Sequence, residues 1–89
     1  MGRYLDLDAG VAGAALAGAG GDLFYELGLM YAAGRAVPLD RVAAHKWFNL
    51  AASRGHAEAG ERRRELAADM DAGEIAHAQR AARDWLRTQ

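Results

Sequence analysis

The fold is decided by residues 22–55, which read DLFYELGLMYAAGRAVPLDRVAAHKWFNLAASRG. In the first part of this stretch, apolar side chains recur at i, i+4, i+7 and i+8, which places them on one face of an α-helix. These side chains are Leu23, Leu27, Met30 and Tyr31. We expect Asp22 to cap the beginning of this helix, and Gly34 to end it in the left-handed conformation that glycine adopts without strain.

A second helix is predicted after a connector that holds the only proline of the chain, Pro38. Proline has no N–H and a fixed φ, so one helix cannot continue through it. Asp40 is placed to cap the second helix and Gly55 to end it. The expected buried stripe consists of Ala43, Trp47, Leu50 and Ala51, widened by Ala44 and Phe48. Two such helices joined by a short loop predict an antiparallel hairpin.

A second pair of helices is predicted in the remaining residues, 56–89. The third helix runs from about His56 to Met70, and its apolar face is narrow, with Ala59, Leu66, Ala67 and Met70. A fourth helix begins at Asp71, which forms a capping box with Glu74. Its apolar stripe consists of Ile75, Ala78, Ala82, Trp85 and Leu86. We therefore expect four main helices in two antiparallel pairs.

Composition supports an all-α fold. The chain has 22 Ala and 10 Leu against three Val, one Ile and one Thr, and chains so poor in β-branched residues seldom build sheets. Its 89 residues are enough for one domain. The net charge of −1 offers no field that attracts nucleic acid or an anionic membrane, and the absence of cysteine excludes disulfides and thiol chemistry.

The N-terminal segment, residues 1–21, is rich in Ala and Gly and has neither the basic start nor the leucine-rich core of a secretory signal. Its apolar stretch, residues 9–21, is also too short and too weakly apolar to span a bilayer. We therefore expect a soluble cytoplasmic protein, or a periplasmic one if the start of the chain is misassigned. Either residues 5–20 form a further helix that covers the N-terminal face of the first hairpin, or a second copy of the chain covers that face in a homodimer.

Groups for catalysis or metal binding are scarce. No two of the three histidines are three or four residues apart, so the helical spacing of metal ligands is missing; they are His45, His56 and His77. We expect His45 to be exposed and His56 to lie in a turn. Ser53 has no nucleophile elbow around it, and no glycine-rich phosphate loop follows a strand. The sequence predicts no metal, no cofactor and no enzymatic activity.

Two further groups of residues could bind a ligand, and each has a simpler explanation. The arginines at positions 62–64 are consecutive on a helix, so they point in different directions and form no flat basic patch for nucleic acid. Trp47 and Trp85 could stack on a ligand, but their stripe positions predict core anchors.

Residues 22–59 resemble a Sel-1-like repeat, an α/α repeat related to the tetratricopeptide type. Ten residues fall on its pattern: Gly28, Tyr31, Gly34, Val37, Asp40, Ala44, Trp47, Ala51, Ala52 and Gly55. One departure is Ala36, where the pattern has a glycine, so a loop that needs positive φ there is strained. Residues 57–86 look like the degenerate capping hairpin that closes such arrays.

The resemblance implies a small adaptor or scaffold that binds a protein or a peptide on a surface lined by the first helices of successive hairpins. Six positions of the first and third helices form the expected contact set: Tyr25, Glu26, Leu29, Ala33, Arg62 and Glu65. The alternative is a structural module that associates only with itself.

Overall fold

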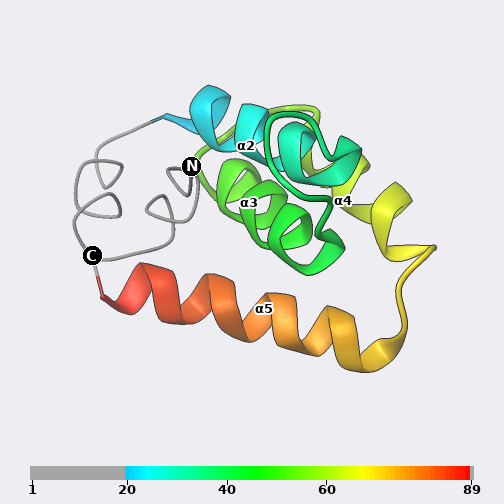
Figure 1. Cartoon of the computed structure of the whole chain (residues 1–89). Helices are drawn as coiled ribbons and strands as arrows, with labels where there is room; N and C mark the ends of the chain where they lie inside the picture. Colours follow the sequence, from blue (N-terminus) through cyan, green and yellow to red (C-terminus); the bar gives the residue numbers. More distant parts are fainter. Residues whose placement is uncertain (1–19, 89) are drawn as a thin grey trace.

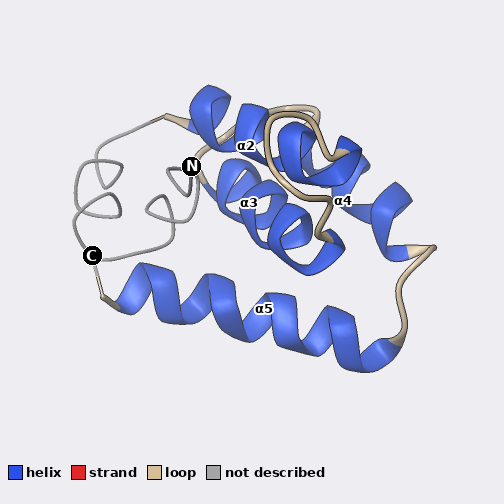
Figure 2. Ribbon diagram, in the orientation of Figure 1, coloured by secondary structure: helices blue, strands red, loops and turns tan. Residues whose placement is uncertain are grey.

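The computed structural model describes residues 20–88. Within this range the chain forms four helices and no strand (Figure 2). The helices are α2 (Gly21–Ala33), α3 (Arg41–Ser53), α4 (Ala59–Ala67) and α5 (Ala72–Arg87). The all-α prediction is confirmed, while the predicted helix over residues 5–20 falls almost entirely on residues 1–19, outside the described part.

Helix α3 lies at the centre and packs against each of the other three helices (Figure 1). It forms the expected hairpin with α2 across the loop that contains Pro38. The second pair has a different arrangement, because α4 and α5 make their main contacts with α3 and not with each other. The first hairpin therefore provides two surfaces, and one later helix covers each of them.

Two of the three predicted N-caps are confirmed by hydrogen bonds of their side chains. The side chain of Asp40 accepts a hydrogen bond from the N–H of Ala43 at 3.0 Å, and Asp71 and Glu74 complete a capping box. The prediction that Asp22 is an N-cap is wrong. Helix α2 begins two residues earlier, with Gly20 as its N-cap, and Asp22 lies in the first turn, where a carboxylate is favoured by the helix dipole.

The third helix is shorter than predicted. It begins at Ala59 and not near His56, which lies in the turn that precedes it, as expected for this histidine. Helix α3 ends at Ser53, and Gly55 turns the chain with a φ of 88°.

The loop between α2 and α3 keeps a left-handed conformation at two positions. Gly34 ends α2 with a φ of 68°, as predicted. Ala36 has the same φ and is the one residue other than glycine with a positive φ in residues 20–88. A side chain disfavours this region of backbone space by about 1–2 kcal/mol. The departure from glycine at position 36 therefore leaves the loop conformation in place and adds strain.

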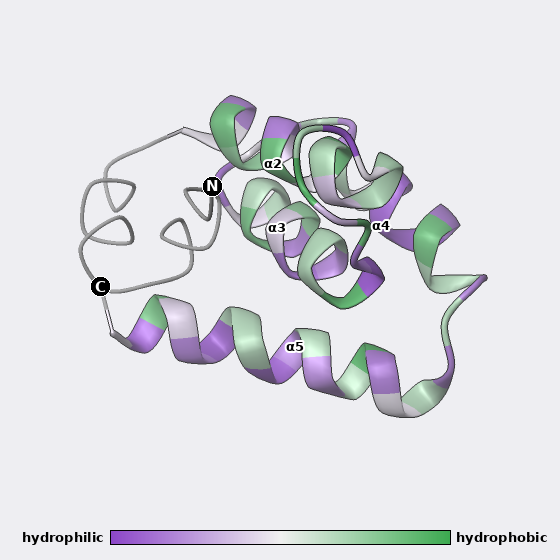
Figure 3. Ribbon diagram, in the orientation of Figure 1, coloured by the Kyte–Doolittle hydropathy of each residue, from purple (hydrophilic) through white to green (hydrophobic). Residues whose placement is uncertain are grey.

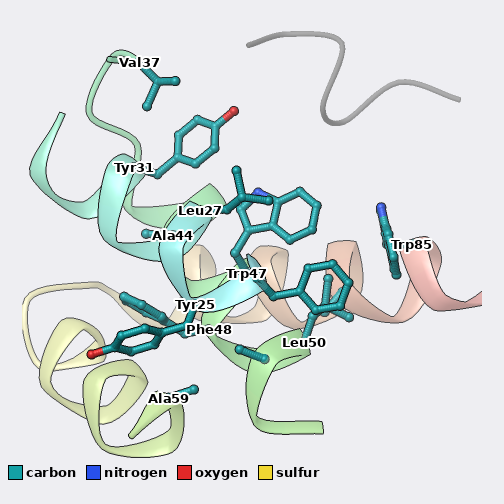
Figure 4. Packing of buried hydrophobic residues seen from close by; sticks show 13 residues of the cluster. Tyr25, Leu27, Tyr31, Val37, Ala44, Trp47, Phe48, Leu50, Ala59 and Trp85 are labelled. Carbon is teal, nitrogen blue, oxygen red and sulfur yellow. The ribbon is translucent and has the colours of Figure 1, made fainter. Parts of the chain in front are cut away.

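The core is centred on three rings, one from each of α2, α3 and α5, which we call the aromatic cluster: Phe24, Trp47 and Trp85. Their ring centroids lie 5.4–5.8 Å apart. Figure 4 shows Trp47 beside Leu27 and above Leu50, with Trp85 reaching in from α5. Both tryptophans are therefore core anchors, as predicted.

Two stripe predictions need correction. On α2, Phe24 is fully buried, whereas Leu23 is 43% exposed. On α5, Ala78, Ala82 and Trp85 are buried, whereas Leu86 is 47% exposed. Hydrophobic and hydrophilic residues alternate along α5 in Figure 3, so only a narrow strip of this helix meets α3. The buried face of α2 is rotated by one residue because Phe24 must reach both α3 and α5.

Candidate functional site

A groove of about 200 Å³ lies between α2 and α4, with α3 beneath it. We call it the α2–α4 groove. It is lined by Leu29, Ala32, Phe48, Arg62, Glu65, Leu66 and Asp69. Four of these side chains are apolar and three are charged, so the groove combines an apolar interior with a charged edge. This combination is typical of surfaces that bind another protein segment.

The floor of the groove depends on a glycine. A Cβ placed on Gly28 would lie 2.4 Å from two ring carbons of Phe48, much closer than carbon atoms approach each other. The missing side chain lets the Phe48 ring lie directly against α2. On its other side, Phe48 packs against Tyr25, with the ring centroids 5.7 Å apart. Figure 4 shows these two rings side by side.

Each of the three consecutive arginines of α4 has a different internal partner. The Tyr25 hydroxyl beside Arg62 raises the pKa of the guanidinium, and the nearby Glu65 and Glu58 add to the increase. Arg63 donates to the side-chain oxygen of Asn49 at 2.7 Å.

Arg64, the third, forms an ion pair with Glu61 at 2.8 Å, one turn earlier on the same helix. The prediction that the three guanidinium groups point in different directions is confirmed.

The carboxylates of the groove are less engaged than the arginines. In the described part of the chain, no hydrogen bond or ion pair holds the side chain of Asp69. Glu65 interacts only through its attraction to Arg62. The charge of the groove that remains available to a partner is therefore negative.

Tyr25 connects α2 to the residues that precede α4. Its ring stacks on His56, with centroids 4.0 Å apart and an angle of 16° between the planes. Nδ1 of His56 accepts a hydrogen bond from the backbone N–H of Glu58 at 3.2 Å, so the ring proton is on Nε2. Nε2 lies 3.6 Å from the carboxylate of Asp22. The ring thus joins α2 to the beginning of α4.

His45 was expected to be exposed, and this prediction is wrong. Only 3% of it is exposed, and its Nδ1 has no hydrogen-bond partner. Burial lowers the pKa of His45, and the positive charge of Arg63 lowers it further. The next residue, Lys46, is also buried, with its ammonium 4.3 Å from the ring centroid of Trp47. Neighbours on three sides of α3 leave little of this helix facing water.

The structure brings three of the six predicted contact residues together: Leu29, Arg62 and Glu65 all line the groove. Glu26 and Ala33 are exposed on α2 but outside the groove, and Glu26 lies 3.9 Å from Arg35. Tyr25, expected to point outward, is buried with 9% of its surface exposed, because it packs beneath α4.

Sequence reasoning missed four residues that line the groove: Ala32, Phe48, Leu66 and Asp69. A helical pattern could have indicated two of them. Ala32 follows the predicted Leu29 by three residues, and Asp69 follows Glu65 by four, so each continues a face already identified. Phe48 and Leu66 had been assigned to buried stripes, where the pattern gives no sign of a groove.

Other sites are less developed. A second hollow, of about 550 Å³, lies at the beginning of α2, and its lining consists of three glycines with Asp22, Leu23, Arg54 and His56. Among residues 20–88, no three acidic or histidine side chains are placed to hold a metal ion. In the same range, no helix has the length and apolar character needed to cross a membrane.

Comparison of the chain with protein-family models, with curated proteins and with solved structures finds no match. The likeness to Sel-1-like repeats therefore rests on the sequence pattern of residues 22–59 and stays a prediction.

Proposed function

We propose that this chain is a protein-interaction module that binds a segment of a partner protein in the α2–α4 groove. The observation that carries the proposal is the meeting of Leu29, Arg62 and Glu65 in one groove. The resemblance to a repeat family implies these three residues as contacts, and more than thirty residues of the chain separate Leu29 from the other two.

The size and lining of the groove support a peptide-sized ligand. An engineered protein cavity of about 150 Å³ holds a benzene molecule, so 200 Å³ accommodates one large apolar side chain. Leu29, Ala32 and Leu66 are all half-buried and would contact such an anchor. The charged edge would then fix its orientation. Interfaces of this kind place most of their affinity in one or two buried anchors.

Self-association is the second candidate, and a separate observation favours it. Leu23 and Leu86 are both exposed, and each is adjacent in the chain to a member of the aromatic cluster, Phe24 or Trp85. In a homodimer these leucines would be covered by a second copy. The surface involved would differ from the α2–α4 groove, so one experiment can separate the two functions.

The experiment uses photo-crosslinking, because the chain contains one lysine, the buried Lys46, and lysine-directed reagents would report little. A photoactivatable amino acid is placed at Ala33, beside the groove on α2, and in a second protein at Ala76, exposed on α5. We expect a heterologous protein crosslinked at position 33 and not at position 76 in native lysate, with the same peptide of that protein recovered repeatedly.

A substitution tests whether the groove itself is used. Ala32→Arg fills the groove with a long side chain, and Ala76→Arg makes the same change on the exposed face of α5. We expect Ala32→Arg to abolish the crosslink from position 33 and Ala76→Arg to preserve it. Crosslinks only to the chain itself, or crosslinks unaffected by Ala32→Arg, would contradict the proposal.

A further inference from the structure

We infer that the segment bound in the α2–α4 groove is basic: an apolar anchor residue accompanied by at least one lysine or arginine. This inference rests on the proposed function and adds the chemistry of the partner.

The arginines are poorly available to an acidic partner. Arg63 is held by Asn49 at 2.7 Å and Arg64 by Glu61 at 2.8 Å, and neither lines the groove. Arg62 does line it, but its guanidinium interacts with the Tyr25 hydroxyl and with the charge of Glu65. An acidic ligand would have to compete with these internal partners for each guanidinium.

The carboxylates of the groove are less engaged than the arginines. Glu65 and Asp69 lie on either side of Leu66 along the chain and line the same groove. The side chain of Asp69 has no hydrogen bond or ion pair within residues 20–88. A ligand side chain that enters against Leu66 would therefore bring its neighbours close to two carboxylates that lack a cation of their own, apart from the partial attraction of Arg62.

Charge complementarity of this kind acts through specificity and the rate of association more than through affinity. The groove supplies the apolar contact, and the two carboxylates select which segments may use it. An acidic segment would meet unpaired like charges, which oppose its binding.

The test begins with a random peptide library displayed on phage and selected against the full-length chain. Peptides that bind are then measured by fluorescence anisotropy against the same chain and against Ala32→Arg. We expect the groove-dependent peptides to be enriched in lysine or arginine next to an apolar residue. Replacing each basic residue by glutamine is expected to weaken binding about two- to fivefold at low salt, the range of exposed ion pairs. High salt should remove this difference.

Matched variants locate the charge effect. Glu65→Gln and Asp69→Asn are expected to produce the same two- to fivefold loss. Glu61→Gln removes one negative charge from the same helix outside the groove, and it should leave binding unchanged.

The outcomes separate the two proposals. Peptides that lose binding with Ala32→Arg but are acidic or uncharged would overturn the basic partner and leave the proposed function standing. If no peptide is selected, or if the selected peptides bind Ala32→Arg as well as the natural chain, the groove is not the binding site. In that case both proposals are overturned.

Discussion

The two sides of α3 are built by different means. Toward α2 and α5, large rings fill the space in the aromatic cluster, and Trp47 is fully buried. Toward α4, the contacts are made mainly by polar side chains. Arg63 of α4 donates a hydrogen bond to Asn49 of α3, and Arg62 of α4 lies beside Tyr25 of α2. The first side provides the apolar burial that stabilises the fold, and the second provides a groove.

The difference has a physical origin in the length and composition of α4. This helix has nine residues, and Ala59 is its one buried member. An isolated helix of that length is unstable in water, so α4 depends on the side chains that connect it to α2 and α3. Because little apolar surface is buried there, the groove wall should open more easily than the aromatic cluster. Four predictions test this contrast, in order of decreasing effect.

Trp47→Ala should have the largest effect, because it removes the ring that contacts both Phe24 and Trp85. We expect the free energy of unfolding to fall by about 3–5 kcal/mol, measured by urea denaturation. Leu39→Ala, on the exposed loop, serves as control and should change it by less than about 0.5 kcal/mol. Equal melting temperatures for the two variants would contradict the burial of Trp47.

Gly28→Ala should have the next largest effect, since the new methyl group would overlap the Phe48 ring. Overpacking of this kind typically costs about 1–3 kcal/mol, and displacing Phe48 would also deform the floor of the groove.

Gly60→Ala is the matched control for this change. At Gly60 the nearest atom to a new Cβ is 3.7 Å away, so the alanine is expected to stabilise helix α4 by about 0.5–1 kcal/mol. Because the two substitutions should change the free energy of unfolding in opposite directions, they distinguish steric overlap from helix propensity. Stabilisation by both substitutions would show that Phe48 does not lie against α2.

Ala36→Gly should stabilise the chain, because it relieves a side chain held at a φ of 68°. The relief is partly offset by the greater freedom of glycine in the unfolded chain, so we expect a net gain of about 0.5–1 kcal/mol. Thermal unfolding monitored by circular dichroism measures it. Ala33→Gly, inside the last turn of α2, should instead destabilise. A loss of stability in both would contradict the left-handed conformation at position 36.

The fourth prediction concerns pH on the α4 side of α3. The pKa of His45 is lowered in the folded chain, from an ordinary value of 6.5, by burial and then by Arg63. The unfolded chain therefore binds the proton more readily, and the free energy of unfolding should decrease as pH falls below about 6.5. Above that pH the contribution of His45 is fully retained.

His45→Leu should flatten this pH dependence at little cost near neutral pH, because Nδ1 has no hydrogen bond to lose. His77→Gln, at an exposed position of α5, should leave the slope unchanged. Urea denaturation between pH 5 and pH 8 compares the three proteins. A slope that survives His45→Leu would show that other groups cause it.

Much of the local structure could be predicted from the sequence. The stops at Gly34 and Gly55 and the caps at Asp40 and Asp71 all depend on neighbours within one or two helical turns. The candidate site was predicted only in part. Leu29, Arg62 and Glu65 were expected as contacts and line the groove, whereas Tyr25, also expected as a contact, is buried. Phe48 is buried as predicted, and nothing in the sequence pattern indicated that it also lies at the floor of the groove.

The sequence by itself determined that this chain is helical, where α2 and α3 end, and that small and large side chains alternate along the helices. Those properties depend on propensity, capping and periodicity, which act over short distances. Only the tertiary structure decided which side of each helix is buried. Because α3 is enclosed on three sides, His45 and Lys46 became interior residues, and α2 turned Phe24 inward in place of Leu23. Burial depends on partners distant in the chain, and no pattern within one helix specifies them.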